Sequence, residues 1–181
     1  MLEPHISESV ATSMWADSDA STSGGFGACV IAGSDIYFMH DQWMDRERGI
    51  FDIADFEAIA YDFTYSFFPR VIPEAFARKR IVGRVDNENV EHAIRGNRTA
   101  KGVLNLVIKR LLLTQVQHHF MLTVTRVSTR DNELADALSR GAIDEFLKIA
   151  RSLGLTPVRV LLTDDQRSLQ RYEDAKASFA D

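Results

Sequence analysis

Asn132 and Asp136 lie four residues apart in the stretch VSTRDNELADALSR at 127–140, where an apolar pattern with helical spacing begins. In a helix this spacing places both side chains one turn apart on the same face. The carboxylate of Asp136 can then hold a hard cation, while the amide of Asn132 faces a substrate. Asn and Asp are also favoured in the first turn of any helix, so an ordinary helix start explains the pair equally well.

Three further acidic residues precede this stretch. Asp19 lies in a small-residue turn between two apolar runs, which is the pattern of a hairpin. Glu57 lies at the edge of an apolar stripe with helical spacing, and Asp86 ends a short β-type run before a helical pattern. Each also has a simpler interpretation, namely a turn residue, a solvated glutamate and a helix cap.

The apolar periodicity predicts the elements that carry these acids. Strands are expected at 12–18, 26–33, 35–43, 80–86 and 120–127, and helices at 53–67, 87–95, 100–118 and 131–152. This order builds an α/β fold with a mixed sheet and helices on its faces. Ligands gather at strand ends in such sheets, and Asp19 and Asp86 fall near strand ends, so the four acids can converge there.

Together these motifs resemble the ribonuclease H domain of retroelement reverse transcriptases. The group most similar is that of the tyrosine-recombinase retrotransposons, with gypsy-type elements and plant pararetroviruses as neighbours. The resemblance covers about residues 12–145 and rests on DAS at 19–21 with GFGA at 25–28, DIxxxE at 52–57, VDN at 85–87, VxRV at 124–127 and ADALSR at 135–140. It implies a ribonuclease H-like fold with a mixed five-stranded sheet, in which three antiparallel strands are followed by two parallel ones.

The resemblance also implies a reaction, the hydrolysis of the RNA strand of an RNA–DNA hybrid by two metal ions. Asp19, Glu57, Asp86 and Asp136 would hold two Mg²⁺ ions about 3.5–4 Å apart, and Mn²⁺ may replace them. In the family's arrangement Asp19 bridges both ions. Glu57 and Asp86 then hold the ion on the leaving-group side, and Asp136 holds the ion that activates water.

Four residues beside the acids are expected to contact the substrate: Ser21, Asn87, Arg126 and Asn132. The two amides are suited to the 2′-hydroxyl groups by which RNA is told from DNA across a wide, shallow minor groove.

The chain departs from the family at three places. Arg126 stands where the family often has a histidine, Ser128-Thr129 replaces a Pro-Gly, and Val85 replaces a threonine. None of these changes removes an acid. Arg126 either places a fixed positive charge beside the scissile phosphate or pairs with a surface acid such as Asp131.

Composition is that of a compact domain in a reducing compartment. The 181 residues, 45% of them hydrophobic, suffice for one domain with a real core. The single cysteine, Cys29, excludes a disulfide framework and is expected in the core. No apolar run approaches a membrane span and no secretory signal is visible, so an intracellular location, in cytoplasm or nucleus, is expected. The net charge of −5 disfavours tight unaided binding to nucleic acid.

The expected organisation is a flexible N-terminus at 1–10, a ribonuclease H-like catalytic domain at 11–153 and a C-terminal extension at 154–181. The extension should hold a short strand and a polar helix that lies on the surface or contacts a partner. We expect the chain to be a hybrid-cleaving module of a reverse transcriptase, with a polymerase domain in cis or in trans. The alternatives are a non-catalytic scaffold of the same fold that binds protein or nucleic acid, and a nuclease that acts on DNA.

Overall fold

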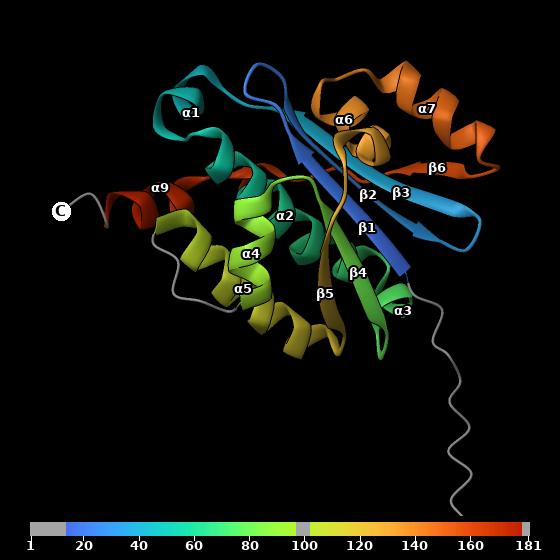
Figure 1. The fold of residues 1–181 in the computed structure, drawn as a ribbon, viewed down its shortest axis with the longest axis horizontal. Helices are drawn as coiled ribbons and strands as arrows, with labels where there is room; N and C mark the ends of the chain where they lie inside the picture. The colour runs from blue at the N-terminus through green and yellow to red at the C-terminus, as the bar shows by residue number, and fades with distance from the viewer. Residues whose placement is uncertain (1–13, 97–101, 179–181) are drawn as a thin grey trace, which may run out of the picture.

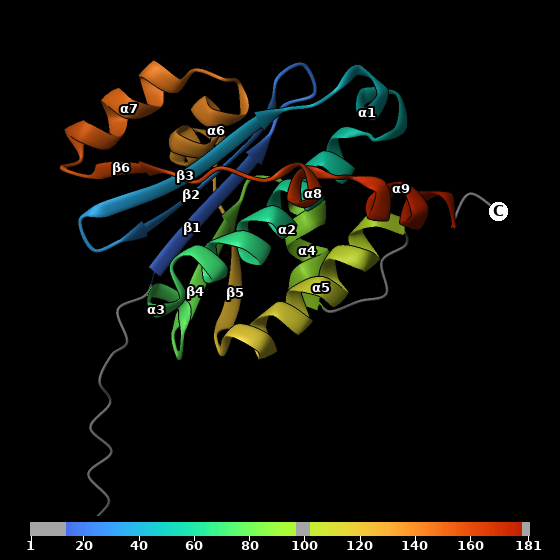
Figure 2. The same cartoon turned by 180° about the vertical axis from the view of Figure 1, so that it is seen from behind.

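The computed structural model describes residues 14–96 and 102–178, which form one mixed sheet with helices on both faces (Figure 1, Figure 2). The six strands are β1 (Met14–Ala20), β2 (Gly25–Ala32), β3 (Asp35–Gln42), β4 (Arg80–Val85), β5 (Met121–Arg126) and β6 (Thr156–Arg159). Their order across the sheet is β5-β4-β1-β2-β3-β6. Strands β1 to β3 form the expected antiparallel meander, and β4 and β5 extend it in parallel. The flexible end expected at 1–10 lies outside the described residues.

The sheet has six strands, so the expected number of five is wrong. The additional strand is β6, which pairs in parallel with β3 from Asp35 opposite Thr156 to Phe38 opposite Arg159. A short strand was expected at this place in the chain, but as part of an extension. A local pattern shows that a segment is extended and does not show which sheet edge it will join.

The helices before β5 follow the expected order with two differences. They are α1 (Asp45–Ile50), α2 (Ile53–Val71), α3 (Pro73–Phe76), α4 (Glu88–Gly96) and α5 (Gly102–His118). Helix α1 was not expected. Helix α2 passes through Pro69, beyond the end expected at 67, because Phe67 and Phe68 in its last turns are buried in the core and a proline removes only one backbone donor.

The helix expected at 131–152 is interrupted. A 3₁₀ turn, η1 (Thr129–Asn132), leads into α6 (Glu133–Ser139), and α7 (Ile143–Ser152) follows after a break. Gly141 adopts a φ of 72° at the break, a left-handed conformation that favours glycine and ends a helix. The apolar spacing continues across the break because both helices pack on the same face of the sheet, which is why periodicity alone joined them.

The helices form two layers, one on each face of the sheet (Figure 1). Helices α2 and α5 pack with the large aromatic cluster on one face, and α6 and α7 cover the other. The close approach of α6 depends on Gly27 in β2. A Cβ atom there would lie 2.3 Å from the Cβ of Leu138 and 2.6 Å from the carbonyl oxygen of Ala135. Gly27 lies opposite Asp19 in the β1–β2 register, so this contact sets α6 directly beside Asp19.

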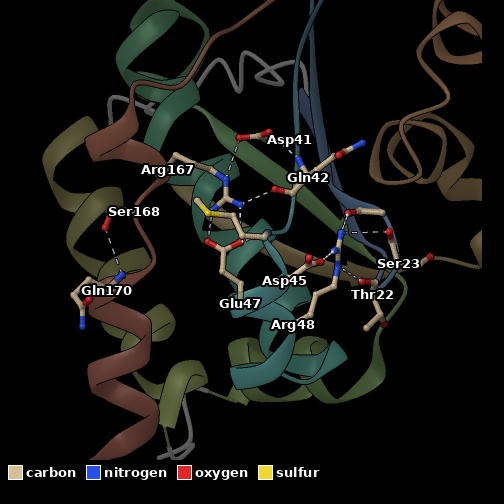
Figure 3. A network of polar contacts seen from close by, with 12 residues as sticks. Thr22, Ser23, Asp41, Gln42, Asp45, Glu47, Arg48, Arg167, Ser168 and Gln170 are labelled. Atoms are coloured by element: carbon tan, nitrogen blue, oxygen red, sulfur yellow. Dashed lines mark hydrogen bonds and ion pairs between the residues drawn. The ribbon is translucent and has the colours of Figure 1, made fainter.

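The segment after α7 is docked on the body of the fold. Its helical part is two short helices, α8 (Asp164–Arg167) and α9 (Gln170–Ala177), and not the single polar helix that the sequence predicted. Tyr172 is fully buried and its hydroxyl donates to Asp62 of α2. Arg167 donates to both carboxylate oxygens of Glu47, at 3.0 and 2.8 Å, and to the backbone carbonyl of Gln42 at 2.7 Å (Figure 3). Among the described residues, no helix has the length and apolar character needed to cross a bilayer.

Candidate active site

The four acids lie on four elements that meet at one end of the central strands. Asp19 is near the end of β1, and Asp86 directly follows β4, its parallel neighbour. Glu57 lies near the start of α2, which packs on β1, and Asp136 lies in α6, which packs on β1 from the opposite face. Parallel strands bring their carboxyl ends to the same edge, which is why Asp19 and Asp86 come together.

Asp19 has a perturbed carboxyl group. Its side chain is buried, and the hydroxyl of Ser139 in α6 donates a hydrogen bond to it. The pKa of Asp19 is raised to about 6, mainly by burial; the negative charges of Asp86 and Asp136 also raise it, whereas Ser139 and Arg140 lower it.

Glu57 is perturbed more strongly. Its pKa is raised to about 8, mainly by burial; the neighbouring charges of Asp86 and Asp19 also raise it, while a hydrogen bond from the side chain of Asn87 opposes the shift. Asp19 and Glu57 thus share Asp86 as a neighbour, and Asp136 faces Asp19. Asp19 is therefore within electrostatic reach of each of the other three carboxyl groups. Their mutual repulsion is the condition that a bound cation would relieve.

The side chains do not form a finished metal site as they stand. Within the residues that the structure describes, no three His, Cys, Asp or Glu side chains converge closely enough to hold an ion. Asp136 is held by Arg140, one turn further along α6, at 2.8 Å. The donor set is nevertheless of the hard oxygen type that Mg²⁺ requires, and two of its members have raised pKa values. The chemistry of these residues therefore fits a divalent cation. Asp136, however, is already paired with the guanidinium group of Arg140.

The hairpin loop that follows Asp19 is braced from α1. The guanidinium group of Arg48 donates to the carbonyl oxygens of Thr22 at 3.1 Å and Gly24 at 3.3 Å, and also pairs with Asp45 (Figure 3). Helix α1 is in turn held by Arg167 through Glu47. The loop beside the acids is thus tied to the C-terminal segment by side chains, although the two are far apart in the sequence.

Comparison with solved structures identifies this architecture. The N-terminal RNase H domain of rv2228c from Mycobacterium tuberculosis is similar with a TM-score of 0.54 and 15% identity, over 70% of this chain and 95% of that chain. LC11-RNase H1, isolated from compost by a metagenomic approach, gives 0.53 and 16%, over 74% and 96%. The same enzyme in complex with an RNA/DNA hybrid gives 0.50 and 13%, over 74% and 97%.

The chain has the ribonuclease H fold. No family model matches its sequence, and no curated protein matches it either. The identities are too low to carry over more than the fold.

The residues expected to contact substrate lie in different surroundings within the ribonuclease H fold. Ser21 is half-buried, and its hydroxyl accepts from the backbone N–H of Gly24 at 3.3 Å. Asn87 caps α4, because its side-chain Oδ1 accepts hydrogen bonds from the backbone N–H groups of Asn89 at 2.8 Å and Val90 at 3.2 Å. Its amide is directed to Glu57. The Asn87 side chain thus lies next to an acid, whereas Ser21 follows Asp19 by two residues and its hydroxyl is used within the hairpin loop.

Asn132 is fully buried, which differs from the substrate-facing position that the sequence suggested. Its amide nitrogen donates to the carbonyl oxygen of Ser18 at 3.3 Å, so it joins the 3₁₀ turn to β1. Asn132 ends the 3₁₀ turn and is the N-cap residue of α6, so Asp136 follows about one turn later, but the Asn132 side chain is directed to Ser18 of β1. In this arrangement Asn132 holds the start of α6 against β1, next to Asp19.

Arg126 is exposed at the end of β5 and pairs with Glu88 of α4 at 3.3 Å. The surface pairing considered for it is therefore present, but with Glu88. The carboxylate of Asp131 instead accepts a hydrogen bond from the hydroxyl of Ser128 at 2.7 Å.

Sequence reasoning missed a second charged group next to the acids. Trp15, Asp17 and Asp19 occupy alternate positions of β1 and therefore point to the same face. Asp17 is buried and paired with Arg84 of β4, whose guanidinium carbon lies 4.9 Å from the ring centre of Trp15. The alternation of these three residues was the available signal. Ser139 and Arg140 were within the recognised motif, but their contacts with Asp19 and Asp136 were not foreseen.

Proposed function

We propose that the chain is a metal-dependent endoribonuclease that hydrolyses the RNA strand of RNA–DNA hybrids. The observation that carries this proposal is the set of four carboxyl groups at the ends of β1 and β4, with the pKa values of Asp19 and Glu57 raised to about 6 and about 8. Mutually repelling carboxyl groups are costly to a fold and are typical of sites that bind a cation. The ribonuclease H fold supports the reaction class by analogy.

Asp19, Glu57, Asp86 and Asp136 would hold Mg²⁺, with Mn²⁺ as a possible substitute. When bound, a pair of such ions supplies a water activated for attack and positive charge that stabilises the leaving 3′-oxygen. The protein's own part is to position the carboxylates. Ser139 orients Asp19 and Asn87 orients Glu57, while Arg140 holds Asp136 in an ion pair that a bound cation would have to displace.

The substrate would be recognised from the loops around the acids. Ser21 and Asn87 would approach the 2′-hydroxyl groups of an RNA strand, and Arg126 would approach a phosphate. One structural neighbour, LC11-RNase H1, was solved with an RNA/DNA hybrid, which supports the same class of substrate.

A polymerase domain in cis or in trans would supply additional affinity. Because the net charge is −5, the isolated chain would bind nucleic acid weakly and with an affinity that depends on salt. Attachment to a reverse transcriptase would raise the effective concentration of substrate at the site. This context remains our inference from the sequence motifs.

The test is cleavage of three end-labelled substrates: an RNA–DNA hybrid, double-stranded RNA and duplex DNA. Each is incubated with the chain in Mg²⁺ or in chelator, beside Asp86→Asn and, as a matched control, Asp144→Asn, which changes an exposed acid of α7. We expect Mg²⁺-dependent cleavage of the hybrid that is lost only in Asp86→Asn. Cleavage of duplex DNA alone would make the chain a DNA nuclease, and activity retained in Asp86→Asn would contradict the assignment of the acids.

A non-catalytic scaffold is the second candidate, and the pairing of Asp136 with Arg140 favours it. The two functions differ in their response to metal. A cation that binds the folded acids and not the unfolded chain raises the melting temperature. At a cation concentration one hundred times Kd, the added free energy of unfolding is about 2.7 kcal/mol. A nuclease should show this rise in millimolar Mg²⁺ and lose it in Asp86→Asn. An unchanged melting temperature in calorimetry would support the scaffold.

A further inference from the structure

An open groove of about 600 Å³ lies beside the candidate active site, on the face of the sheet that α6 only partly covers. Its floor is formed by β1, β4 and β5, and its rim by the turn that leads into α6. The candidate acids are not among the residues that line it.

The floor of the groove carries an aromatic platform. Trp15 is 50% exposed, although it stands in a strand whose other residues are all buried. One side of its ring is covered by the guanidinium group of Arg84, at 4.9 Å from the ring centre. Arg84 is itself fixed, because its Nε donates to the buried carboxylate of Asp17 at 2.5 Å and a second nitrogen donates to the other oxygen. The platform is therefore held in one orientation before any ligand binds.

The rim carries charges of both signs. Arg126 and Arg130 are exposed, and so are Asp131 and Glu133. Exposed arginines beside an aromatic ring are the pattern by which proteins hold the phosphates and stack the bases of single-stranded nucleic acid. The two carboxylates can accept hydrogen bonds from the amino groups of unpaired bases.

The groove and the candidate acids share strand β1. Trp15 and Asp19 lie on the same face of the strand, four residues apart, or about 13 Å at ~3.3 Å per residue. That distance corresponds to about four stacked nucleotides at ~3.4 Å each. A strand that passes the acids can therefore reach the platform with few nucleotides between them.

We propose that this groove binds an unpaired strand of nucleic acid, with a base stacked on Trp15 and phosphates against Arg126 and Arg130. Its position relative to Asp19 assigns it the single-stranded overhang of a substrate bound at the acids, and this part rests on the proposed nuclease function. The binding itself needs no metal and no cleavage.

The test is binding of a fluorescently labelled eight-nucleotide oligothymidylate, measured by anisotropy in chelator. Emission of Trp15 provides a second readout, because the other tryptophan, Trp43, is buried. We expect quenching of the exposed tryptophan and an affinity that falls about fivefold to a hundredfold in Trp15→Leu, the range for loss of one stacked base. Trp15→Phe, which keeps a ring, should retain most of the affinity. Equal melting temperatures would show that the variants are folded.

Arginine variants test the phosphate contacts. Arg130→Gln should weaken binding and lower the salt dependence by about 0.7, the slope lost with one phosphate contact to a single strand. Arg159→Gln, at the opposite edge of the sheet on β6, should change neither.

Three outcomes would overturn the proposal: no quenching, equal affinity in Trp15→Leu, or Trp15-dependent binding of an acidic peptide but not of the oligonucleotide. None of them depends on hybrid cleavage. Asp86→Asn should bind the oligonucleotide with the same affinity as the wild type. Loss of hybrid cleavage and loss of oligonucleotide binding are therefore separate results.

Discussion

At the scale of single residues, the candidate site is defined by the free-energy cost of burying carboxyl groups close to one another. Asp19 is buried beside Asp86 and Asp136, and Glu57 faces Asp86 and Asp19. An acid whose pKa is raised on folding binds its proton more tightly in the folded state than in the unfolded state. Stability is therefore lost as the pH rises through the interval between the two values.

Asp19→Asn should stabilise the metal-free protein at pH 8 and leave it unchanged near pH 3.5. For Asp19 the cost of ionisation appears between 3.8 and about 6, and for Glu57 between 4.5 and about 8. The gain at pH 8, after allowance for solvent screening, should be about 1–2 kcal/mol, or roughly 2–8 °C in melting temperature. Thermal melts across pH in chelator measure it. A destabilised variant at pH 8 would show that the carboxyl groups do not repel one another.

Arg126 poses a different question, because it already has a partner. If it serves only its exposed ion pair with Glu88, Arg126→Ala and Glu88→Gln should have the same small effect, within about 1 kcal/mol of stability and without loss of turnover. If Arg126 contacts the scissile phosphate, Arg126→Ala alone should lower turnover of the hybrid, and by more than it weakens binding. Arg126→His should then restore part of the rate with a pH dependence near 6–7, the range of a histidine pKa. Steady-state kinetics of the three variants decide between the two roles.

At the scale of elements, the site is assembled by the contact of α6 with β2. Asp136 and Ser139 reach Asp19 only because Gly27 leaves room for the helix backbone. The sequence showed that a helix carries Asp136. It did not show how closely that helix approaches the sheet.

Gly27→Ala should therefore damage both stability and site. The added Cβ would meet Leu138 at 2.3 Å and the backbone nitrogen of Ser139 at 2.6 Å, so α6 must move outward. We expect a loss of about 1–3 kcal/mol, the usual cost of overpacking, and a hybrid-cleavage rate that falls further than stability explains. Gly49→Ala is the matched control, because nothing lies within 4 Å of its added Cβ and its φ is not positive. Equal effects of the two variants in denaturant melts would argue against a tight α6–β2 contact.

At the scale of the whole molecule, the C-terminal segment is joined to the fold by buried polar contacts. It contributes β6 to the sheet, Tyr172 to the core and Arg167 to Glu47. Asp62 and Glu47 are buried acids that contact Tyr172 and Arg167 of this segment, and removal of those neighbours would leave part of their charge uncompensated.

Arg167→Met should destabilise the protein by about 3–5 kcal/mol, because it leaves the 4%-exposed Glu47 without its bidentate partner. A second change, Glu47→Met, should recover most of that loss. Arg46→Ala breaks an ion pair with Glu173 in which the arginine is 67% exposed, and should cost less than about 1 kcal/mol. Denaturant melts of the wild type, Arg167→Met, Glu47→Met and the double variant form a double-mutant cycle, and Arg46→Ala is its control. Equal losses from Arg167→Met and Arg46→Ala would show that the buried pair does not hold the segment in place.

The sequence by itself determined the order and type of most elements and the position of each acid on them. These features follow from local periodicity and from short motifs, and the mixed sheet that they predicted is observed with β6 as an additional strand. Only the tertiary structure decided that β6 joins the edge of β3, that the helix after η1 breaks at Gly141, that Asn132 is buried and that Arg126 pairs with Glu88. The tertiary structure also decided that Trp15 and Arg84 line one groove, because the groove is formed by side chains of three strands. Each depends on a contact between segments distant in the chain, and a pattern of neighbouring residues carries no information about such contacts.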